Sequence, residues 1–442
     1  MYEGKKIFVL GMGRSGIAVS KLLCEKNHIL LTDVKCDDLG LIKELEDMGI
    51  NVVITKNQAE LFNENFDYLV KNPGIRADHE VVVKAKKLGI PVINEMEVAY
   101  NLLPDGVKIV GITGSNGKTT TTSITYEILK LADLPVHVGG NLGIPLCSII
   151  KNVKAGDILV LEVSSHQLVD LNNFKTDISV LTNLSEVHLD MFGTYENYKN
   201  NKLRIFNHHT SNDIAILNGK DKDVVELTQN IPSRKVYFSS VGEADYYIKD
   251  NKIFYHDEEI CELNDNRLKG MHNYENVMCA LAVAREFNVS SDVIKEALDN
   301  FSGVEHRMEF VRRLNEREFY NDSKATNNKS TIVALSSFTS PVILLLGGLD
   351  RGQSFDELDD HMNYVKGVIC YGETRDKIKD YCNSRGIEVT VVDDLDEAVK
   401  LAYNLSEEGD TILFSPACAS WDQFSSFEER GEKFKEIVDN LQ

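Results

Sequence analysis

KIVGITGSNGKTTTTS, residues 108–123, sets an apolar strand, a glycine-containing loop and the start of a helix in direct succession. Small loop residues let backbone N–H groups approach phosphate oxygens, and a helix N-terminus favours negative charge. Gly117 closes the loop, Lys118 offers a cation for the β- and γ-phosphates, and Thr119 offers a hydroxyl for Mg²⁺. The stretch predicts a parallel α/β domain that binds a nucleoside triphosphate.

One position departs from the strict pattern G-x-x-x-x-G-K-[ST], because Ile112 stands where the first glycine belongs. The bland alternative is a glycine-rich turn capped by Thr119, but such a turn does not need a lysine directly before the helix. We therefore keep the phosphate-loop interpretation. Its predicted ATP-binding residues are Gly114, Ser115, Asn116, Gly117, Lys118, Thr119 and Thr120.

Short apolar runs alternate with helical patterns on both sides of this loop, which is typical of parallel sheets covered by helices. The length of 442 residues exceeds what one core usually serves. We predict an α/β protein of three domains. They are a Rossmann-like domain at 1–94, a P-loop ATPase-like domain at 95–302 and a second Rossmann-like domain at 303–442.

Residues 234–263 follow a different pattern of short polar strands separated by turns. The runs are VYFSS at 236–240, DYYIK at 245–249, KIFYH at 252–256 and EEICEL at 258–263. They predict a small antiparallel patch at the edge of the central domain.

Composition excludes several classes of function. The net charge of −21 argues against a nucleic-acid-binding surface, which needs lysine and arginine to neutralise phosphates. The eight cysteines are scattered without metal-site or disulfide spacing, and no apolar run nears 18 residues. Residues 1–10 lead straight into a strand pattern. We expect a cytoplasmic protein that makes no membrane contact and, since no coiled-coil repeat is present, a monomer.

A second glycine motif, GMGRSG at 11–16, follows an apolar strand, and Asp33 ends the next strand. Alone, this arrangement suggests NAD, and a dinucleotide-dependent oxidoreductase is one alternative function. The motif specifies only a tight turn with a phosphate-friendly helix end, so a nucleotide diphosphate fits as well.

Two side chains follow strands of the predicted central sheet. Glu162 ends one strand and His188 lies beyond the next, so both should face the edge that carries the phosphate loop. They are candidate Mg²⁺ ligands, although histidine is unusual for a hard cation. Alternatively, Glu162 caps the following helix and His188 is an ordinary hydrogen-bonded polar residue.

Nine segments together resemble the Mur ligase family of peptidoglycan precursor synthesis, and within it the members that add D-glutamate. The segments are TGSNGKTTT, GGNLG at 139–143, LEVSSHQL at 161–168, NLSEVHLD at 183–190, KLRI at 202–205, HNYENVMCA at 272–280, EHRMEF at 305–310, NDSKATN at 321–327 and SPACASWDQF at 415–424. The resemblance covers almost the whole chain. It implies an ATP-dependent ligase that joins D-glutamate to UDP-N-acetylmuramoyl-L-alanine through an acyl phosphate.

The same resemblance implies roles for individual residues. It implies ATP contacts at Asn276, Arg307 and Asp322, and catalytic roles for Lys118, His188 and Lys202. It places two Mg²⁺ ions, the first on Thr119 and Glu162, the second on His188 and a carbamylated Lys202. It implies substrate contacts at Ser15, Asp33, Gly74, Asn141, Gln167, Lys324, Thr326, Arg351, Ser420 and Phe427.

Two positions depart from the family pattern. Arg351 stands where some relatives carry lysine, and Val34 follows Asp33 where a hydroxyl residue is expected. Arginine still binds carboxylates, even bidentately. The alternatives that stay open are another ligase of the superfamily, such as a different Mur ligase or a folylpolyglutamate synthetase, and a non-catalytic nucleotide-binding module.

Overall fold

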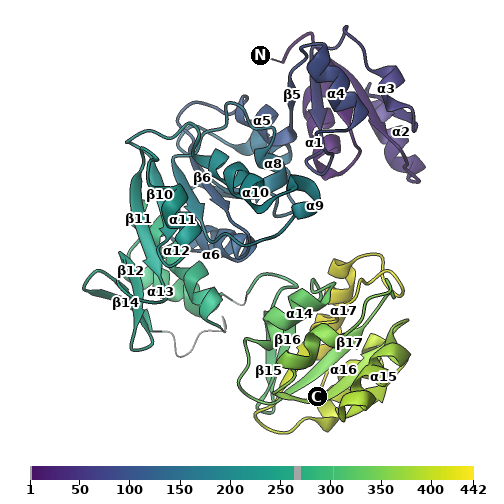
Figure 1. Ribbon diagram of the computed structural model, residues 1–442, viewed down its shortest axis with the longest axis vertical. Coiled ribbons are helices and arrows are strands. Elements are labelled where there is room, and N and C mark those ends of the chain that lie inside the picture. Colours follow the sequence, from purple (N-terminus) through teal and green to yellow (C-terminus); the bar gives the residue numbers. More distant parts are fainter. Residues whose placement is uncertain (1, 263–269, 302) are drawn as a thin grey trace. The chain divides into compact units, whose positions relative to one another are not determined.

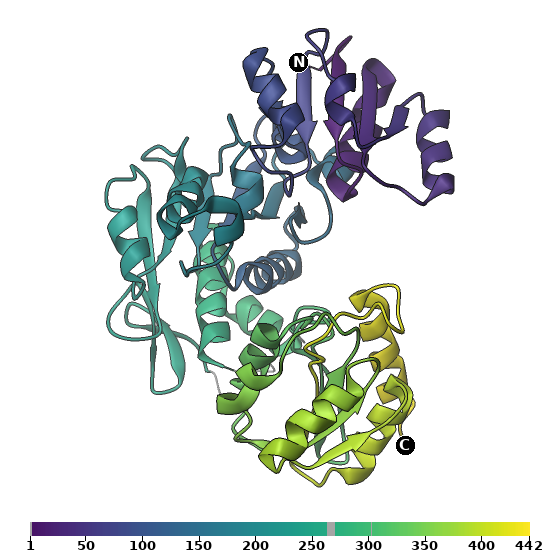
Figure 2. The same ribbon diagram turned by 45° about the vertical axis from the view of Figure 1, so that its right-hand side comes forward.

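The computed structural model describes residues 2–262, 270–301 and 303–442. The chain divides into two compact units. The first holds the N-terminal and central sheets and takes in Tyr274–Leu298, while the second is built mainly from Asp299–Gln442. Figures 1 and 2 show that helices cover each of the three sheets formed by the described residues.

The N-terminal sheet is parallel, in the order β3-β2-β1-β4-β5. Its β1 alternates between two cores, because Ile7 and Val9 pack on one face and Phe8 and Leu10 on the other. Its strands are β1 (Lys6–Leu10), β2 (His28–Asp33), β3 (Asn51–Ile54), β4 (Tyr68–Lys71) and β5 (Val92–Ile93), and its helices α1 (Arg14–Leu23), α2 (Leu39–Asp47), α3 (Gln58–Leu61) and α4 (Glu80–Lys87).

The central sheet has the order β14-β13-β12-β11-β10-β9-β6-β8-β7. Its strands are β6 (Lys108–Thr113), β7 (Val136–Gly140), β8 (Ile158–Glu162), β9 (Ile178–Leu181), β10 (Ile214–Asn218), β11 (Arg234–Ser239), β12 (Tyr246–Lys249), β13 (Lys252–Tyr255) and β14 (Glu258–Glu262). The chain crosses over β6 between β8 and β9. The loops after β6 and β9 therefore meet at a topological switch point, where ligands bind in open α/β sheets.

The helices of this region are α5 (Glu95–Tyr100), α6 (Lys118–Leu131), α7 (Leu146–Ile149), α8 (Ser165–Leu168), α9 (Leu189–Phe192), α10 (Tyr195–Lys202), α11 (Lys222–Leu227), α12 (Met271–Glu286) and α13 (Ser291–Asn300). Three helices bear on the site. α6 starts from the phosphate loop, α12 meets it through a hydrogen bond between Asn276 and Thr121, and α10 ends at Lys202.

The predicted antiparallel patch is confirmed for β12, β13 and β14 and wrong for β11. Residues 236–239 of the run VYFSS lie in β11, which pairs parallel to both β10 and β12 and so belongs to the main sheet. Its inward side chains Val236 and Phe238 are buried like those of the parallel strands, a pattern that its polar neighbours hide in the sequence.

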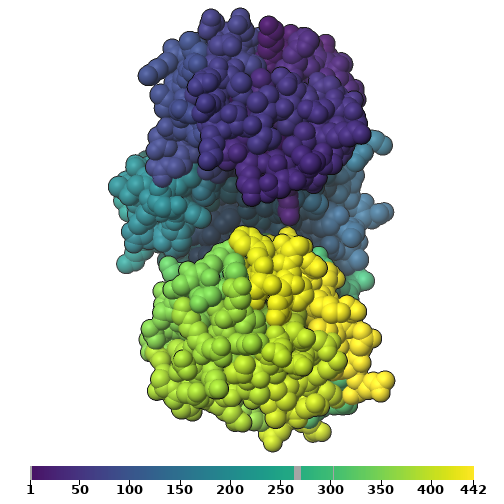
Figure 3. All heavy atoms as spheres, turned by 90° about the vertical axis from the view of Figure 1, so that its right-hand side faces the viewer, coloured from purple at the N-terminus to yellow at the C-terminus, as the bar shows by residue number. Residues whose placement is uncertain are grey.

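The sheet of the second unit has the order β15-β16-β20-β17-β18-β19, and only β15 runs antiparallel to its neighbour. Leu344 and Leu346 of β17 face the core under α14 and α15, and Ile343 and Leu345 face the core under α16 and α17. In Figure 3 the C-terminal segment, in yellow, lies at the surface of this unit beside its green segments. The elements are β15 (Glu309–Leu314), β16 (Arg317–Asn321), α14 (Asn328–Leu335), β17 (Val342–Gly347), β18 (Val365–Tyr371), α15 (Arg375–Arg385), β19 (Val389–Val391), α16 (Leu395–Leu405), β20 (Thr411–Phe414) and α17 (Phe427–Asp439).

The predicted α/β class with two Rossmann-like parts around a P-loop part is confirmed. The predicted boundary at 302–303 touches residue 302, which lies outside the described residues. None of the described helices is both long and apolar enough to cross a membrane.

Candidate functional site

Two glycines give the phosphate loop its shape. Gly114 and Gly117 have φ values of 148° and 81°, which side chains rarely adopt. A Cβ on Gly114 would lie 1.9 Å from the Thr182 hydroxyl oxygen, and one on Gly117 would lie 2.2 Å from Oδ1 of Asn276. The loop therefore packs so closely against β9 and α12 that only glycine fits.

Backbone and side-chain bonds fasten the loop to the segment after β9. The Ser115 N–H donates to the Asn183 carbonyl (2.9 Å), and the Asn116 N–H donates to Asn183 Oδ1 (3.0 Å). The Thr182 hydroxyl donates to the Asn116 carbonyl (2.6 Å). These bonds preorganise the turn, and sequence reasoning missed Thr182 and Asn183 because no motif spacing marks them.

Lys118 starts α6, and its ammonium donates to the loop's own carbonyls at Gly114 (3.0 Å) and Ser115 (2.8 Å). Thr119 and Thr120 follow in the first turn of α6, where both are buried. The helix start thus presents a cation and hydroxyl groups at the loop, as the sequence predicted.

Glu162 ends β8 beside the phosphate strand and is 2% exposed. Its Oε1 accepts a hydrogen bond from Asn141 Nδ2 (2.6 Å). Its buried Oε2 has no hydrogen-bond partner among the described residues. Since a buried carboxylate oxygen without a partner is costly, this atom fits a ligand for a cation. The alternative that Glu162 caps a helix is wrong, because Ser164 caps α8.

Lys202 lies at the end of α10 and is 1% exposed. Its amine donates to the Thr113 hydroxyl (2.9 Å) and lies 5.6 Å from the centre of the Tyr198 ring. Among the described residues no carboxylate forms an ion pair with this amine, although the negative charge of Glu162 acts on it. Burial, and next the positive charge of Lys118, lower the pKa of Lys202 well below its usual range.

His188 precedes α9 with φ of 57° and is exposed. Its ring lies edge-on to that of His166, with centroids 4.9 Å apart, and 6.3 Å from the Tyr198 ring. Burial of part of the ring, followed by the charges of Lys118 and Lys202, lowers the pKa of His188. A neutral imidazole is the form that can bind a metal ion.

The first unit thus brings most of its predicted residues to one sheet edge: the loop, Glu162, His188, Lys202 and Asn276. Asn276 reaches the loop from α12, where its Oδ1 accepts from the Thr121 hydroxyl (3.3 Å). No spacing argument from the sequence identified Asn276. Only the family resemblance pointed to it.

The glycine turn after β1 of the N-terminal sheet is held by hydrogen bonds to a side chain of the same sheet. Asp33 Oδ2 accepts from the Met12 N–H (2.6 Å) and Oδ1 from the Val34 N–H (2.7 Å), so the carboxylate holds the turn after β1. Gly16 admits no side chain, because a Cβ would lie 2.0 Å from the Gly11 carbonyl oxygen. Ser15 is half-buried on this turn, and Gly74, on the loop after β4, is exposed with open space around it.

A buried ion pair joins the N-terminal sheet to the central one. Lys71, at the end of β4, lies 2.6 Å from Asp170 Oδ2, just after α8. The two side chains are 1% and 10% exposed. Nearby, Asn94 Nδ2 donates to the backbone carbonyl of Gln167 (2.7 Å), and Gln167 Oε1 accepts from the Ser164 N–H (2.9 Å).

The remaining predicted residues belong to the second unit. Asp322, at the end of β16, is buried, and its carboxylate accepts from the Met308 N–H (3.2 Å) and the Ser415 hydroxyl (2.7 Å). Burial raises the pKa of Asp322 to about 7. Arg307 is exposed. Four of the predicted amino-acid contacts lie on the loops that follow β16, β17 and β20, and the fifth begins α17: Lys324, Thr326, Arg351 and Ser420, and Phe427.

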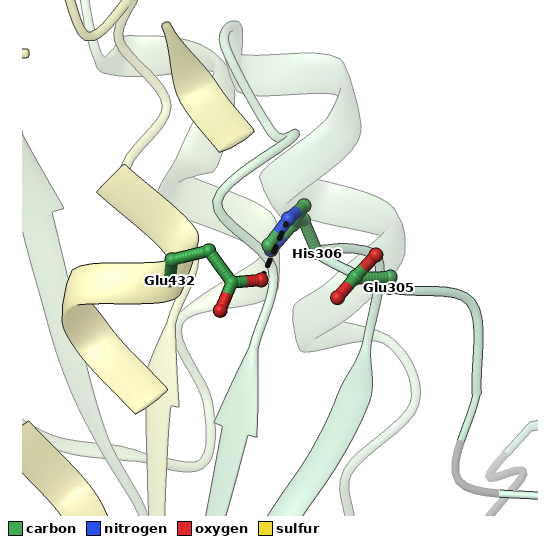
Figure 4. Close-up of side chains that lie close together, drawn as sticks. All are labelled: Glu305, His306 and Glu432. Atoms are coloured by element: carbon green, nitrogen blue, oxygen red, sulfur yellow. Dashed lines mark ion pairs between the residues drawn. The ribbon is translucent and has the colours of Figure 1, made fainter. Parts of the chain in front are cut away.

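Glu305, His306 and Glu432 form a separate group in the second unit, with possible ligand atoms within 4.8 Å of one another (Figure 4). Lys435 already neutralises it, because its ammonium lies 2.8 Å from Glu305 and 2.7 Å from Glu432. The His306 ring already has a hydrogen-bond partner, because its Nδ1 lies 3.1 Å from Nδ2 of Asn321. The group therefore reads as a surface ion-pair network around a packed histidine.

Comparison with known proteins agrees with this geometry. Family models match three successive segments: the MurD-like N-terminal domain of Mur ligases at 5–94, the Mur ligase middle domain at 112–284, and the glutamate ligase domain of Mur ligases at 306–418. Proteins named UDP-N-acetylmuramoylalanine–D-glutamate ligase are similar along the whole chain. Those of Bacillus cereus and Geobacillus kaustophilus are 41% and 42% identical, covering 100% of this chain and 98% of each relative.

Solved structures show the same fold. The UDP-N-acetylmuramate-alanine ligase MurC of Thermotoga maritima superposes with a TM-score of 0.61 at 18% identity, covering 99% of this chain and 100% of that one. The MurF ligase of T. maritima, solved with ADP, gives 0.55 at 18% identity, covering 99% and 96%. From its three matched domains and its full-length relatives, the chain belongs to the Mur ligase family.

Proposed function

We propose that the protein is an ATP-dependent ligase that adds D-glutamate to UDP-N-acetylmuramoyl-L-alanine in peptidoglycan precursor synthesis. The observation that carries the proposal is the phosphate loop with Lys118 at the same sheet edge as the unpartnered oxygen of Glu162. Relatives with that printed name, similar over the full length, support the choice of substrates.

The reaction has two steps. The carboxylate of UDP-N-acetylmuramoyl-L-alanine attacks the γ-phosphorus of ATP, forming a C–O–P bond and releasing ADP. The amine of D-glutamate then attacks the acyl carbon, so that a C–N bond forms, the amine loses its proton and phosphate leaves. Lys118 and the loop N–H groups stabilise the charge that gathers on the phosphates.

Magnesium fits the residues present, because Glu162 Oε2 is buried without a partner and Thr119 lies in the first turn of α6. We assign Thr119 and Glu162 to a first ion and His188 to a second. When bound, the ions neutralise phosphate charge. Asn141 holds Glu162 through Oε1 and so leaves Oε2 for that purpose.

Substrates are assigned by position. Ser15, Asp33 and Gly74 would receive the uridine diphosphate at the N-terminal switch point, and Asn141 and Gln167 the muramoyl-alanine part. Asn276, with Arg307 and Asp322 of the second unit, would contact ATP. Lys324, Thr326, Arg351, Ser420 and Phe427 would hold D-glutamate.

We further propose that Lys202 carries a carbamate. Its amine is buried and forms no ion pair among the described residues, and burial with the charge of Lys118 outweighs that of Glu162, so the lowered pKa favours the neutral form, which reacts with CO₂. The nitrogen bonds to the CO₂ carbon and one proton is released. The product is a carboxylate near Lys118 and an oxygen ligand for the second ion.

A coupled assay of ADP release across amino acids tests the function. We expect release to require both the UDP-linked acceptor and an amino acid, with D-glutamate far more effective than L-glutamate, D-alanine or diaminopimelate. Phosphate release that is equal with and without D-glutamate would contradict the ligase assignment. Preference for another amino acid would show that the protein has the activity of a different Mur ligase.

The carbamate has its own test. Protein kept in ¹³C-bicarbonate should show a carbamate resonance that is absent from Lys202→Ala, and acetate or formate should restore part of that variant's activity. Lys199→Ala, three residues earlier on α10, is the matched control. A spectrum in which unmodified protein and Lys202→Ala look alike would exclude the modification.

A further inference from the structure

The second unit has its own topological switch point, between β17 and β20. From β17 the chain continues outward to β18 and β19, while β20 returns to lie between β17 and β16. Ligands of open α/β sheets bind beyond the carboxyl ends of strands at such a point. Residues 348–353, after β17, and 415–426, after β20, form the two loops there.

The two loops are fastened to each other. The Leu349 N–H donates to the Ala419 carbonyl (2.9 Å), and Gln353 Nε2 donates to Cys418 Sγ (3.2 Å). A Cβ on Gly348, whose φ is 144°, would lie 2.3 Å from the Ala419 carbonyl oxygen. Close backbone contact thus fixes where the next side chains of each loop emerge.

Those side chains include Arg351 and Trp421, which form a cation–π contact. The guanidinium carbon of Arg351 lies 4.7 Å from the centre of the Trp421 ring, and Trp421 is 63% exposed. Among the described residues Arg351 forms no ion pair. Its neighbour Asp350 is already used, accepting from the Gly352 N–H (2.8 Å) and pairing with Lys377 at 3.3 Å.

A guanidinium that lies over an aromatic ring keeps N–H groups that can bind a second partner. The Arg351 guanidinium has no carboxylate partner among the described residues and lies at a switch point. It is therefore suited to bind a substrate carboxylate through two N–H groups. The other side of β20 repeats the arrangement, because Lys324 lies 5.5 Å from the centre of the Phe427 ring. Two cations from the loops flanking β20 are therefore each paired with an aromatic ring that follows β20.

We propose that Trp421 is a positioning residue for the amino-acid substrate: it holds Arg351 so that the guanidinium edge receives one carboxylate of D-glutamate. The inference rests on the proposed function and deepens it. Two cations, each lying over an aromatic ring, select an amino acid with two carboxylates over one with a single carboxylate.

Steady-state kinetics with three variants test the role. Trp421→Ala should raise the KM for D-glutamate two- to fivefold, which corresponds to about 0.4–1 kcal/mol, and leave kcat and the KM for ATP within twofold. Trp421→Phe keeps a ring and should recover most of the loss. Tyr364→Ala, which removes an aromatic residue 49% exposed just before β18, is the control and should change nothing.

A double-variant comparison separates positioning from general structure. In an Arg351→Ala background, Trp421→Ala should have no further effect on the KM for D-glutamate. An equal rise in both backgrounds would overturn the proposal, since Trp421 would then act without Arg351. An unchanged KM in Trp421→Ala, in protein that shows D-glutamate-dependent ADP release, would overturn it as well.

Trp421 also reports on binding directly, because it is the sole tryptophan of the chain. With the UDP-linked acceptor and a non-hydrolysable ATP analogue present, titration with D-glutamate should change tryptophan emission. Arg351→Ala should abolish the change. Emission that stays constant at D-glutamate concentrations that saturate turnover would count against the proposal, whereas absence of turnover in unmodified protein would remove the proposed function itself.

Discussion

Single residues of the site stand out because they are buried and polar but lack part of the hydrogen bonds or ion pairs that such groups usually form. Glu162 keeps one oxygen bonded to Asn141 and the other without a partner. Lys202 is a buried amine with a hydroxyl partner and no ion pair among the described residues. Such arrangements cost stability and persist where a ligand completes them.

Lys118→Ala should lower kcat by about 10²–10³, the loss typical when a group that stabilises transition-state charge is removed. Lys130→Ala, in the last turn of the same helix and largely exposed, serves as its control. The measurement is ADP release at saturating substrates. Near-normal turnover of the Lys118 variant would show that ATP binds elsewhere.

His209 should make folding sensitive to acid. Its ring nitrogens bond only to hydroxyl groups, Nε2 with Thr176 and Ser179 and Nδ1 with Ser233, and burial lowers the pKa of His209 to about 4. Between the ordinary value near 6.5 and about 4, the unfolded chain binds the proton and the folded one does not. Stability should therefore fall as pH drops through that window.

Thermal unfolding at pH 7.5 and pH 5 measures the effect. His209→Gln should unfold at a lower temperature than the unmodified protein at pH 7.5, yet lose roughly 2–4 °C less on acidification. The exposed His256 gives the control variant His256→Gln. An identical acid response of all three proteins would exclude His209 as a source.

At the scale of elements, the sequence predicted buried parallel strands well because their apolar runs are continuous. It misassigned β11, whose alternation resembles that of an antiparallel edge, and it did not predict β7 or the β15–β16 hairpin. Arg312, Arg313 and Arg317 give that hairpin a polar character, while Phe319 and Tyr320 of β16 are buried. Only tertiary packing against β20 and α17 decides its place.

The residues of the candidate site also fall into those that the sequence alone predicted and those that needed more. The phosphate loop and Glu162 followed from motif and strand position, since both require only local sequence. Lys202, Asn276 and the second-unit residues needed the family resemblance, because elements distant in sequence position them. The partners Thr182 and Asn183 were not predicted by either route.

The joint between the first two sheets depends on Lys71 and Asp170. Asp170→Asn would leave the ammonium of Lys71 buried without a counter-charge, which costs about 3–5 kcal/mol, so the unfolding temperature should drop by several degrees. The pair Lys71→Met with Asp170→Leu should recover most of the loss. Lys108→Met, which breaks an exposed pair with Asp177, should have little effect.

Across the protein, the net charge is strongly negative although the proposed substrates are anions as well. The net charge is −21, yet local cations stand at each predicted anion site: Lys118 and Lys202 in the first unit, Lys324 and Arg351 in the second. Pocket charge and backbone N–H groups decide anion binding there, whatever the global sign.

Two segments far apart in the sequence carry the proposed ATP contacts, which makes a prediction for hydrogen exchange. Mg²⁺ with an ATP analogue should slow amide exchange at residues 113–120 and also at 304–324, around Arg307 and Asp322. Lys118→Ala should lose both effects. Protection of the first segment alone would show that Arg307 and Asp322 have other roles.

The hydrogen bonds of Lys118 have a consequence for nucleotide affinity. Its ammonium donates to the Gly114 and Ser115 carbonyls, so a phosphate group that binds in the loop must compete with two acceptors of the loop itself. The bonds that the ammonium gives up therefore offset part of its attraction to the phosphates.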